Sequence, residues 1–278
     1  MLDGTGPENK AAPSAWQAGL IGLARCVRFF SRLPVPGLPF EADPHAAPDL
    51  SGMVRALPFA GLVIGLPASL VLAASLALGL DSWLCATLSI AALAVSTGAM
   101  HEDGLADLAD SFGGATRERK LAIMKDSLVG SYGVCALILA FLLRIGALAA
   151  LADRLDALPV CLGFLAACSL SRLAGVAPLA FLPPARSDGL SRGVGQPSRD
   201  SFWIGAILAT CVTILLGFFG GLPKAGIGLM LIAAALAGWL VTRLSRRLFG
   251  GQTGDVAGAG QQAAEIAVWL ALLIAVTP

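Results

Sequence analysis

Long apolar stretches separated by short polar ones dominate this chain. Six of them, near residues 57–80, 83–100, 133–151, 158–182, 202–221 and 224–242, are long enough to cross a membrane as helices, and a shorter seventh lies near 262–277. A helix needs about 17–25 residues to cross the hydrocarbon core. The pattern therefore predicts an all-α, polytopic integral membrane bundle of six or seven transmembrane helices.

The segment before the first span has a different pattern. Residues 16–30 alternate apolar side chains with Arg25 and Arg28, which is typical of an amphipathic helix lying in the membrane interface. Residues 1–15 are polar, contain Gly and Pro, and lack the order of a cleaved signal peptide. We expect a flexible N-terminus over 1–15 and a single transmembrane domain over 16–278. The Pro-rich stretch 34–48 is either a linker or a lid.

Composition supports the membrane assignment. The 278 residues are 56% hydrophobic and 13% charged, against roughly 25% charged residues in soluble domains. A net charge of +1 gives no reason to expect a nucleic-acid partner. The 6 cysteines are scattered through apolar segments without a Cys-x-x-Cys pair, so we expect small buried side chains rather than disulfides or a zinc site.

Basic residues are distributed unequally between the two sides. Successive spans cross the membrane in opposite directions, so every second loop lies on the same side as the N-terminal region. Fifteen of the 19 Lys and Arg residues fall in that region or in those loops. The positive-inside rule makes this side cytoplasmic. The polar motifs described below all fall on the same side, whereas the opposite loops are short. An enzyme acting on a cytoplasmic substrate needs access from one side only, while a transporter needs both, so the asymmetry favours an enzyme.

An acidic run directly follows the second span. Asp103, Asp107 and Asp110 have i, i+4 and i+7 spacing, so on a helix they share one face. Like charges at this spacing cost roughly 0.2–0.5 kcal/mol per pair. The run predicts a bound divalent cation, and hard carboxylate oxygens favour Mg²⁺. His101, at the head of the run, is either a proton carrier or a histidine at the membrane interface.

Three further segments carry polar groups on the same side. Lys125 and Asp126 precede a glycine-rich turn at 130–133 that allows a ligand to approach the backbone, and phosphate oxygens suit Lys125. Arg172 lies inside the fourth span, where a structural ion pair and a phosphate contact are equally good interpretations. Residues 250–255 form a polar, glycine-rich loop that is not a Walker A motif.

Two other ionisable side chains lie in apolar segments. We expect Arg144 to be structural or to extend toward the interface. Glu265 is expected to pair with an arginine or to border the site. In the loop at 250–255, Asp255 is a candidate metal ligand or hydroxyl partner.

Taken together, these motifs resemble the cobalamin synthase family, the adenosylcobinamide-GDP ribazoletransferases. The resemblance rests on residues 101–107, 123–127 and 250–255, followed by Gln261, Gln262 and Glu265, and extends to 29–36 and 182–186. It implies an Mg²⁺-dependent membrane transferase of late vitamin B12 biosynthesis. Such an enzyme transfers the adenosylcobinamide-phosphate group of adenosylcobinamide-GDP to α-ribazole or its 5′-phosphate, forming adenosylcobalamin or its phosphate and releasing GMP.

The resemblance also implies roles for individual residues. Asp103, Asp107 and Asp110 are expected to hold Mg²⁺, and Lys125 and Arg172 to stabilise charge on the leaving GMP. Asp126 and His101 remain alternatives for the base that accepts the ribose proton. The expected substrate-binding residues are Arg172, Arg186, Gln252, Thr253 and Asp255.

The expected location is the bacterial inner membrane, with the active site facing the cytoplasm. The expected partners are the two small-molecule substrates and the lipid bilayer. Homo-oligomerisation and association with other enzymes of cobalamin assembly are further open expectations.

Two other classes compete with this interpretation. A CDP-alcohol phosphotransferase-like enzyme also uses an Asp-Gly motif, but its motif carries an arginine that is missing after Asp103-Gly104. A cation-coupled transporter is suggested by Arg144, Arg172 and Glu265 in apolar segments. Transporters of that kind are commonly built from repeated halves, and the sequence shows no such repeat.

Overall fold

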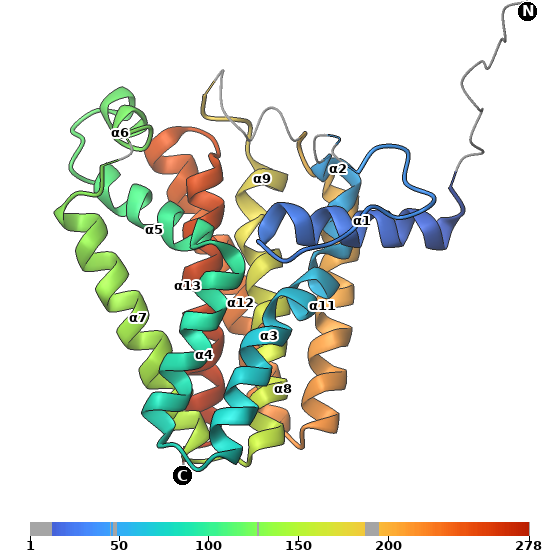
Figure 1. The fold of residues 1–278 in the computed structure, drawn as a ribbon. Coiled ribbons are helices and arrows are strands. Elements are labelled where there is room, and N and C mark those ends of the chain that lie inside the picture. The colour runs from blue at the N-terminus through green and yellow to red at the C-terminus, as the bar shows by residue number, and fades with distance from the viewer. Residues whose placement is uncertain (1–12, 45, 47–48, 127, 187–194, 278) are drawn as a thin grey trace, which may run out of the picture.

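The protein is a bundle of helices that run between two ends of the molecule (Figure 1). The computed structural model describes residues 13–44, 46, 49–126, 128–186 and 195–277. One end of the bundle carries α6 (Arg117–Ile123), and we call it the α6 end. The opposite end carries the C-terminus and the turn between α3 and α4. In the described residues the regular elements are helices, apart from one isolated bridge between Pro184 and Gln252.

Six helical stretches are long and apolar enough to cross a membrane, which confirms the predicted fold class. The first, Leu50–Ala77, consists of α2 (Leu50–Met53), a 3-10 turn η1 (Val54–Ala56) and α3 (Leu57–Ala77). The others are α7 (Ser131–Ala152), α8 (Ala157–Gly175) with α9 (Ala177–Phe181), α11 (Arg199–Phe219), α12 (Lys224–Phe249) and α13 (Gly254–Ala275).

The last helix begins eight residues earlier than the sequence pattern predicted. The side chain of Thr253 accepts a hydrogen bond from the backbone N–H of Val256 and so caps α13. The Gly-rich residues that follow form the first turns of the helix. As a result α13 is a full-length span, and its polar beginning lies at the α6 end.

The predicted span over 83–100 corresponds to the first part of a bent pair of helices, and its last residues belong to the bend. The chain forms α4 (Ser82–Thr97) and then α5 (Met100–Ser111), which are bent by 89° relative to each other. The bend lies at Gly98 and Ala99, whose φ angles are 62° and 55°. This left-handed conformation ends α4, and glycine adopts it at little cost. Consequently the acidic run turns sideways instead of continuing along the axis of α4.

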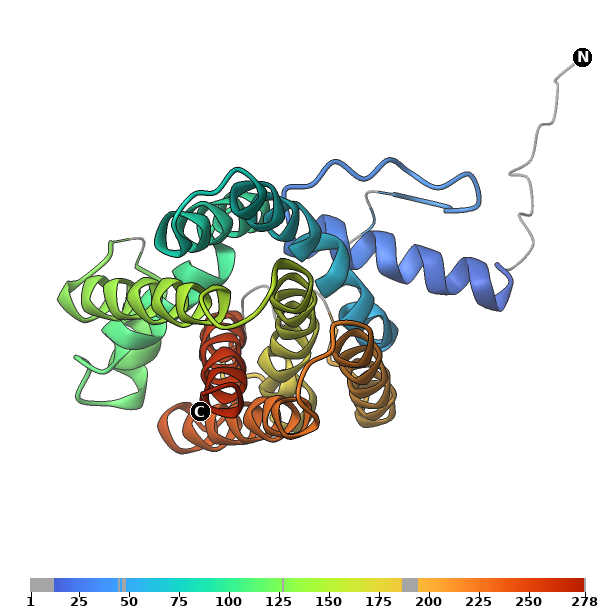
Figure 2. The ribbon, with the colours of Figure 1, turned by 90° about the horizontal axis from the view of Figure 1, so that it is seen from below.

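Helix α8 forms the centre of the bundle. Seen along the helices, it is surrounded by α3, α11, α12 and α13 (Figure 2), and most of its residues are buried. Small side chains allow close packing, since a Cβ added at Gly61 of α3 would lie only 2.6 Å from the carbonyl oxygen of Cys168. Four of the six cysteines are buried as expected, but Cys135 and Cys211 are exposed, because they lie on outward-facing sides of α7 and α11.

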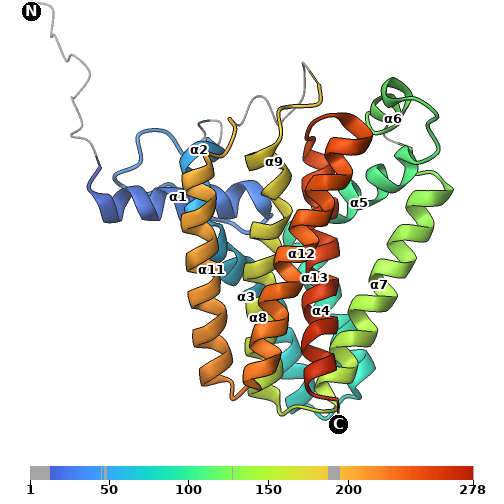
Figure 3. The ribbon, with the colours of Figure 1, turned by 180° about the vertical axis from the view of Figure 1, so that it is seen from behind.

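The predicted helix over 16–30 is confirmed as α1 (Ala15–Phe30), which lies across the other helices (Figures 1 and 3). The segment after it folds back along α1, held by the buried carboxylate of Glu41. Oε1 of Glu41 accepts hydrogen bonds from Arg25 Nε at 3.1 Å and Arg28 Nη1 at 3.0 Å. The described part of the Pro-rich stretch is therefore fastened to α1. Residues 1–12 of the predicted flexible N-terminus lie outside the described residues.

We expect Glu41→Gln to destabilise the protein by about 1 kcal/mol at pH 7, and by much less in acid. Burial raises the pKa of Glu41, but hydrogen bonds from Arg28 and Arg25 lower it more, so it lies below the usual value of 4.5. Stability from a lowered pKa is present above the unfolded-state value and is lost as pH falls through the folded-state value. Thermal midpoints of wild type and variant at pH 7 and pH 4 measure this. An equal difference at both values would contradict the ion-pair explanation.

Candidate active site

The site is built where α5 crosses α13. A Cβ added at Gly104 would lie 2.8 Å from the backbone oxygen of Asp255, and one added at Gly258 would lie 3.4 Å from the Cα of Gly104. Two glycines, one on each helix, thus let the backbones touch. This contact brings the acidic face of α5 to the start of α13.

A cavity of about 180 Å³ lies at this crossing. Its polar lining comes from His101, Asp103, Arg172, Asp255 and Gln261, and its apolar lining includes Phe29, Phe30, Leu50, Met100, Val176 and Leu179. Residues from α1, α5, α8 and α13 therefore meet in one place, although they are far apart in the sequence. Of the predicted site residues, His101, Asp103, Arg172 and Asp255 are brought together here.

Arg172 is buried in the wall of this cavity with much of its hydrogen-bonding capacity unused. Its Nη1 donates to the carbonyl oxygen of Cys168 at 3.0 Å. Its Nε and Nη2 have no hydrogen-bond partner among the described residues. Buried guanidinium groups normally have their donors satisfied. Of the two interpretations left open by the sequence, the unpartnered donors favour an anion contact over a structural ion pair.

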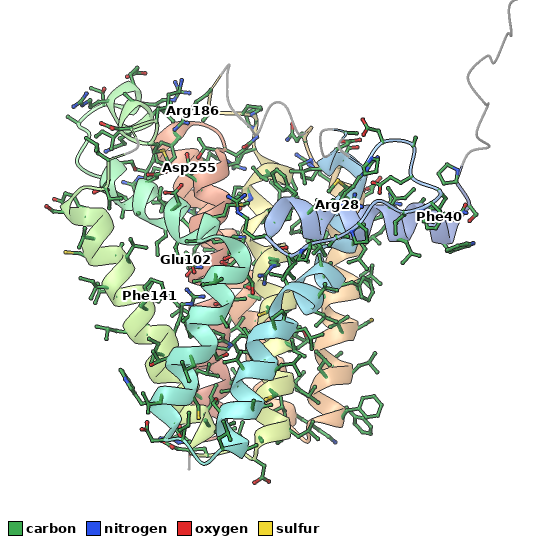
Figure 4. All side chains as sticks on the ribbon, in the orientation of Figure 1. Arg28, Phe40, Glu102, Phe141, Arg186 and Asp255 are labelled. Carbon is green, nitrogen blue, oxygen red and sulfur yellow. The ribbon has the colours of Figure 1, made fainter. Side chains whose placement is uncertain are left out.

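Several negative charges gather beside the cavity. Asp107 is half-buried, and the charges of Asp103, Asp255 and Asp110 all act on it. The carboxylate of Asp255 lies 3.5 Å from Nη2 of Arg186, and Figure 4 shows these two side chains together at the α6 end. One arginine leaves most of the acidic charge uncompensated, so the group attracts cations.

The carboxylate oxygens are the donor type that Mg²⁺ prefers. In the described part of the chain, no set of three or more His, Cys, Asp or Glu side chains is arranged to hold a metal ion unaided. Mg²⁺ commonly takes only one or two carboxylates and completes its shell with water and substrate phosphates. The residues therefore fit an Mg²⁺ ion that arrives with a phosphate substrate.

Asp110 has a structural role that its position in the sequence does not indicate. Its Oδ2 accepts a hydrogen bond from the backbone N–H of Gly130 at 2.7 Å, and its Oδ1 accepts one from Gly133 at 2.8 Å. These amides belong to the first turn of α7, so Asp110 caps that helix from outside. The spacing that placed Asp110 on the acidic face is correct, while its role as a metal ligand stays a prediction.

The three predicted catalytic residues are placed differently. His101 is buried in the cavity wall, with its ring stacked on that of Phe30 at a centroid distance of 6.2 Å. Lys125 and Asp126 are exposed on the turn after α6, and neither is among the residues that line the cavity. Oδ1 of Asp126 accepts a hydrogen bond from the backbone N–H of Leu128 at 3.2 Å. The described structure therefore brings only His101 to the cavity.

The glycine-rich loop positions Arg186 and Asp255. The backbone of Gln252 pairs with the segment before Arg186, through hydrogen bonds of 2.8 Å with Pro183 and Ala185. Gln252 and Thr253 are both buried. Thr253 caps α13, so it has a structural role in addition to the predicted substrate contact, which stays a prediction for both residues.

Arg117 supports this loop from α6. Its Nε donates to the carbonyl oxygen of Phe249 at 2.6 Å, and its Nη2 donates to that of Ala185 at 2.9 Å. This role of Arg117 was not predictable from the sequence, because its partners are distant in the chain.

A buried ionic group lies below the cavity. Arg144 of α7 contacts Glu102 of α5 at 2.8 Å and Glu265 of α13 at 2.9 Å. Gln261 then links Glu265 to the cavity, because its Nε2 donates to Oε2 of Glu265 at 2.7 Å and to Oγ of Ser171 at 3.1 Å. The expected pairing of Glu265 with an arginine is confirmed, while the participation of Glu102 was not predicted.

Comparison with known proteins agrees with this site. Residues 22–273 match the model of a family described as cobalamin-5-phosphate synthase. This chain belongs to that family. The matched segment includes every residue that lines the cavity, and the resemblance of the motifs to the cobalamin-5-phosphate synthase family is confirmed.

Individual members of the family are closely similar over nearly their full length. A protein of Azorhizobium caulinodans named adenosylcobinamide-GDP ribazoletransferase is 47% identical, with 93% of this chain and 97% of the relative covered. Proteins of the same name from Xanthobacter autotrophicus and Bradyrhizobium diazoefficiens are each 46% identical, covering 91% and 87% of this chain and 95% and 89% of the relatives. No solved structure matches the chain.

The glycine crossing gives a direct test of how this cobalamin-5-phosphate synthase family member builds its site. We expect Gly104→Val to lower activity at least 100-fold, because a Cβ there meets backbone at 2.8 Å and forces α5 away from α13. Gly146→Val of α7 is a matched control, since a Cβ at that glycine meets nothing within 4 Å. Activity and detergent-solubilised yield of both variants are to be compared. Full activity in Gly104→Val would show that the crossing does not position the site.

Proposed function

We propose that the protein transfers the adenosylcobinamide-phosphate group of adenosylcobinamide-GDP to α-ribazole or its 5′-phosphate, with release of GMP. One observation carries the proposal: Asp103 and Asp255 share a cavity with the unpartnered guanidinium donors of Arg172. A diphosphate substrate needs both a cation-binding group and a direct cationic contact. Membership of the cobalamin-5-phosphate synthase family and the names of the relatives support the same reaction.

We further propose that the reaction depends on Mg²⁺. Asp103, Asp107 and Asp255 would hold the ion. Asp255 was already a candidate ligand in the sequence, whereas both carboxylate oxygens of Asp110, the third expected ligand, accept hydrogen bonds from the start of α7. When bound, Mg²⁺ neutralises charge on the diphosphate. Arg172 and Arg186 are the residues of this chain that would bind the phosphate oxygens and hold the diphosphate in place.

The bond changes follow from the substrates. A ribose hydroxyl of α-ribazole attacks the phosphorus on the cobinamide side of the diphosphate, and the bond from this phosphorus to the bridging oxygen breaks. GMP leaves with the electron pair of that bond, and the hydroxyl proton passes to a base. His101 is favoured over Asp126 as that base because it lines the cavity. Burial and the positive charge of Arg172 disfavour a charged imidazolium, so the ring is neutral in the free protein. It would become a stronger base once the negatively charged diphosphate lies beside it.

The size of the cavity limits what enters it. About 180 Å³ is less than the roughly 300–1,000 Å³ of typical small-molecule sites. We infer that the cavity receives the reacting phosphates and the attacking ribose hydroxyl, with the flat base of the ribazole near the apolar wall formed by Phe29 and Phe30. The much larger corrinoid would then stay outside, at the α6 end. The distribution of basic residues supports a cytoplasmic location for this end in the bacterial inner membrane.

The test is an assay of the purified protein in liposomes with adenosylcobinamide-GDP, α-ribazole and MgCl₂. We expect equal amounts of GMP and adenosylcobalamin, and no product when EDTA replaces Mg²⁺. Replacing adenosylcobinamide-GDP by CDP-diacylglycerol, and α-ribazole by a simple alcohol, tests the competing phosphotransferase class. Folded protein that makes no cobalamin under any of these conditions would refute the proposal, and product formation in EDTA would refute the Mg²⁺ dependence alone.

A further inference from the structure

A second, larger cavity lies on the membrane-facing side of the bundle, away from the site. It has a volume of about 440 Å³ and lies between α11 and α12, with α8 as its floor. Figure 3 shows α11 and α12 next to each other, with α8 behind them. Both helices pack mainly on other partners, α11 on α8 and α12 on α13. A groove is therefore left open between them.

The groove is apolar along its length and positively charged at one end. Its walls include Leu173, Ala206, Leu231 and Ala235, and Arg246 closes it toward the α6 end. From Leu231 to Arg246 the groove follows α12 for about 22 Å at 1.5 Å per residue. One leaflet of the hydrocarbon core is about 15 Å deep. The groove thus has the length and polarity of an acyl chain attached to an anionic headgroup.

Arginines and tryptophans surround the charged end. Arg243, Arg246 and Arg247 line one shallow hollow at the surface. The guanidinium carbon of Arg243 lies 5.5 Å from the ring centre of Trp239, and Trp239 and Trp203 both line the groove while remaining more than half exposed. Tryptophans are enriched at the level of lipid headgroups. Basic pockets between helices on the cytoplasmic side bind anionic lipid headgroups.

None of the described acidic residues forms an ion pair with Arg243, Arg246 or Arg247. The carboxylates that form ion pairs in the described structure contact Arg25, Arg28, Arg117, Arg144 and Arg186 instead. The arginines at this end are therefore complementary to an anion, and the apolar lining of the groove is complementary to a hydrocarbon chain. We propose that the α11–α12 groove binds one anionic phospholipid, with an acyl chain between the helices and the phosphate at Arg246 and Arg243. This site is separate from the proposed active site and does not depend on the proposed reaction.

The experiment is native mass spectrometry of the full chain after reconstitution in vesicles of equal parts phosphatidylglycerol and phosphatidylcholine, followed by detergent extraction. We expect one phosphatidylglycerol retained per chain. Arg246→Gln should lower the preference for phosphatidylglycerol about fivefold, as expected for one arginine near the headgroup. Ala235→Phe, which fills the exposed part of the groove, should remove retention of either lipid. Lys224→Gln, at the opposite end of α12, is the control and should leave retention unchanged.

Three outcomes would overturn the proposal. One is equal retention of both lipids by the wild type. Another is unchanged retention in Ala235→Phe, with Tm confirming that the variant is folded. A third is a dimer that carries no lipid and is dissociated by Ala235→Phe, which would show that a second copy fills the groove. Glycerol 1-phosphate added in solution should not displace the lipid. Displacement would be a fourth contrary result, because it would show that the phosphate alone is recognised and that no acyl chain holds the lipid in the groove.

Discussion

Asp103→Asn and Asp107→Asn are each expected to lower kcat about 10²–10³-fold while leaving the bundle intact. Asp103 is exposed and Asp107 is half-buried. Among the described residues neither carboxylate forms a hydrogen bond or an ion pair, and the crossing of α5 and α13 is made by glycines. The amide keeps the shape of each side chain but removes the negative charge that would hold Mg²⁺. Single-turnover rates measured across a range of Mg²⁺ concentrations test this.

The control for this pair is Asp156→Asn. Asp156 precedes α8 at the end of the bundle opposite α6, is exposed, and makes no capping hydrogen bond through its side chain. It should keep the wild-type rate. A weaker apparent affinity for Mg²⁺ in Asp103→Asn or Asp107→Asn would support the metal assignment. Near-normal rates at low Mg²⁺ would show that the residue in question is not a ligand.

Arg144→Met is expected to destabilise the protein by about 3–5 kcal/mol and to lower its Tm by roughly 6–20 °C. Arg144 is 1% exposed, and its removal leaves Glu102 and Glu265 buried without their cation. Such a loss is a large part of the roughly 5–15 kcal/mol that stabilises a typical domain. Thermal unfolding in detergent, followed by tryptophan fluorescence, measures it.

A matched variant separates loss of charge pairing from loss of packing. The triple substitution Glu102→Met, Arg144→Met, Glu265→Gln removes all three charges, while Gln at 265 preserves a partner for Gln261. Replacing a complete buried ionic group by residues of similar size is often neutral. The triple variant should therefore be more stable than Arg144→Met alone. If the triple variant is instead less stable than Arg144→Met, loss of the cation does not explain the destabilisation of the single variant.

The spans were predictable because hydrocarbon imposes a simple requirement on length and polarity. The bend at Gly98 and Ala99 was not predictable from the sequence. Hydropathy shows where the apolar stretch ends, but it does not show that the two residues there adopt the left-handed conformation. The early start of α13 was missed for a related reason. Its first turns are rich in glycine, which favours a loop in isolation, and they become helical because they pack against α5 and α8.

The sequence indicated the kind of site, a group of carboxylates suited to a cation, but only some of the residues that form it. The i, i+4 spacing identified Asp103 and Asp107, since local geometry sets which helical face a residue occupies. That Asp255 joins them, and that Asp110 caps α7 instead of lying free, depends on contacts between helices distant in sequence. The glycine within the acidic run was a usable signal, because glycine in a helix costs about 1 kcal/mol and commonly marks close packing.

The ionic group at Arg144 also has a consequence for the order in which the chain enters the membrane. Helix α13 has a mean hydropathy of 1.3, the lowest among the six spanning stretches, and it is the last to be synthesised. It carries Glu265, which is costly to place in hydrocarbon alone. When α13 is synthesised, α7 has already been made, so Arg144 is available to pair with Glu265. Completion of the ion pair thus favours insertion of the final helix, and the same helix then delivers Asp255 to the acidic face of α5.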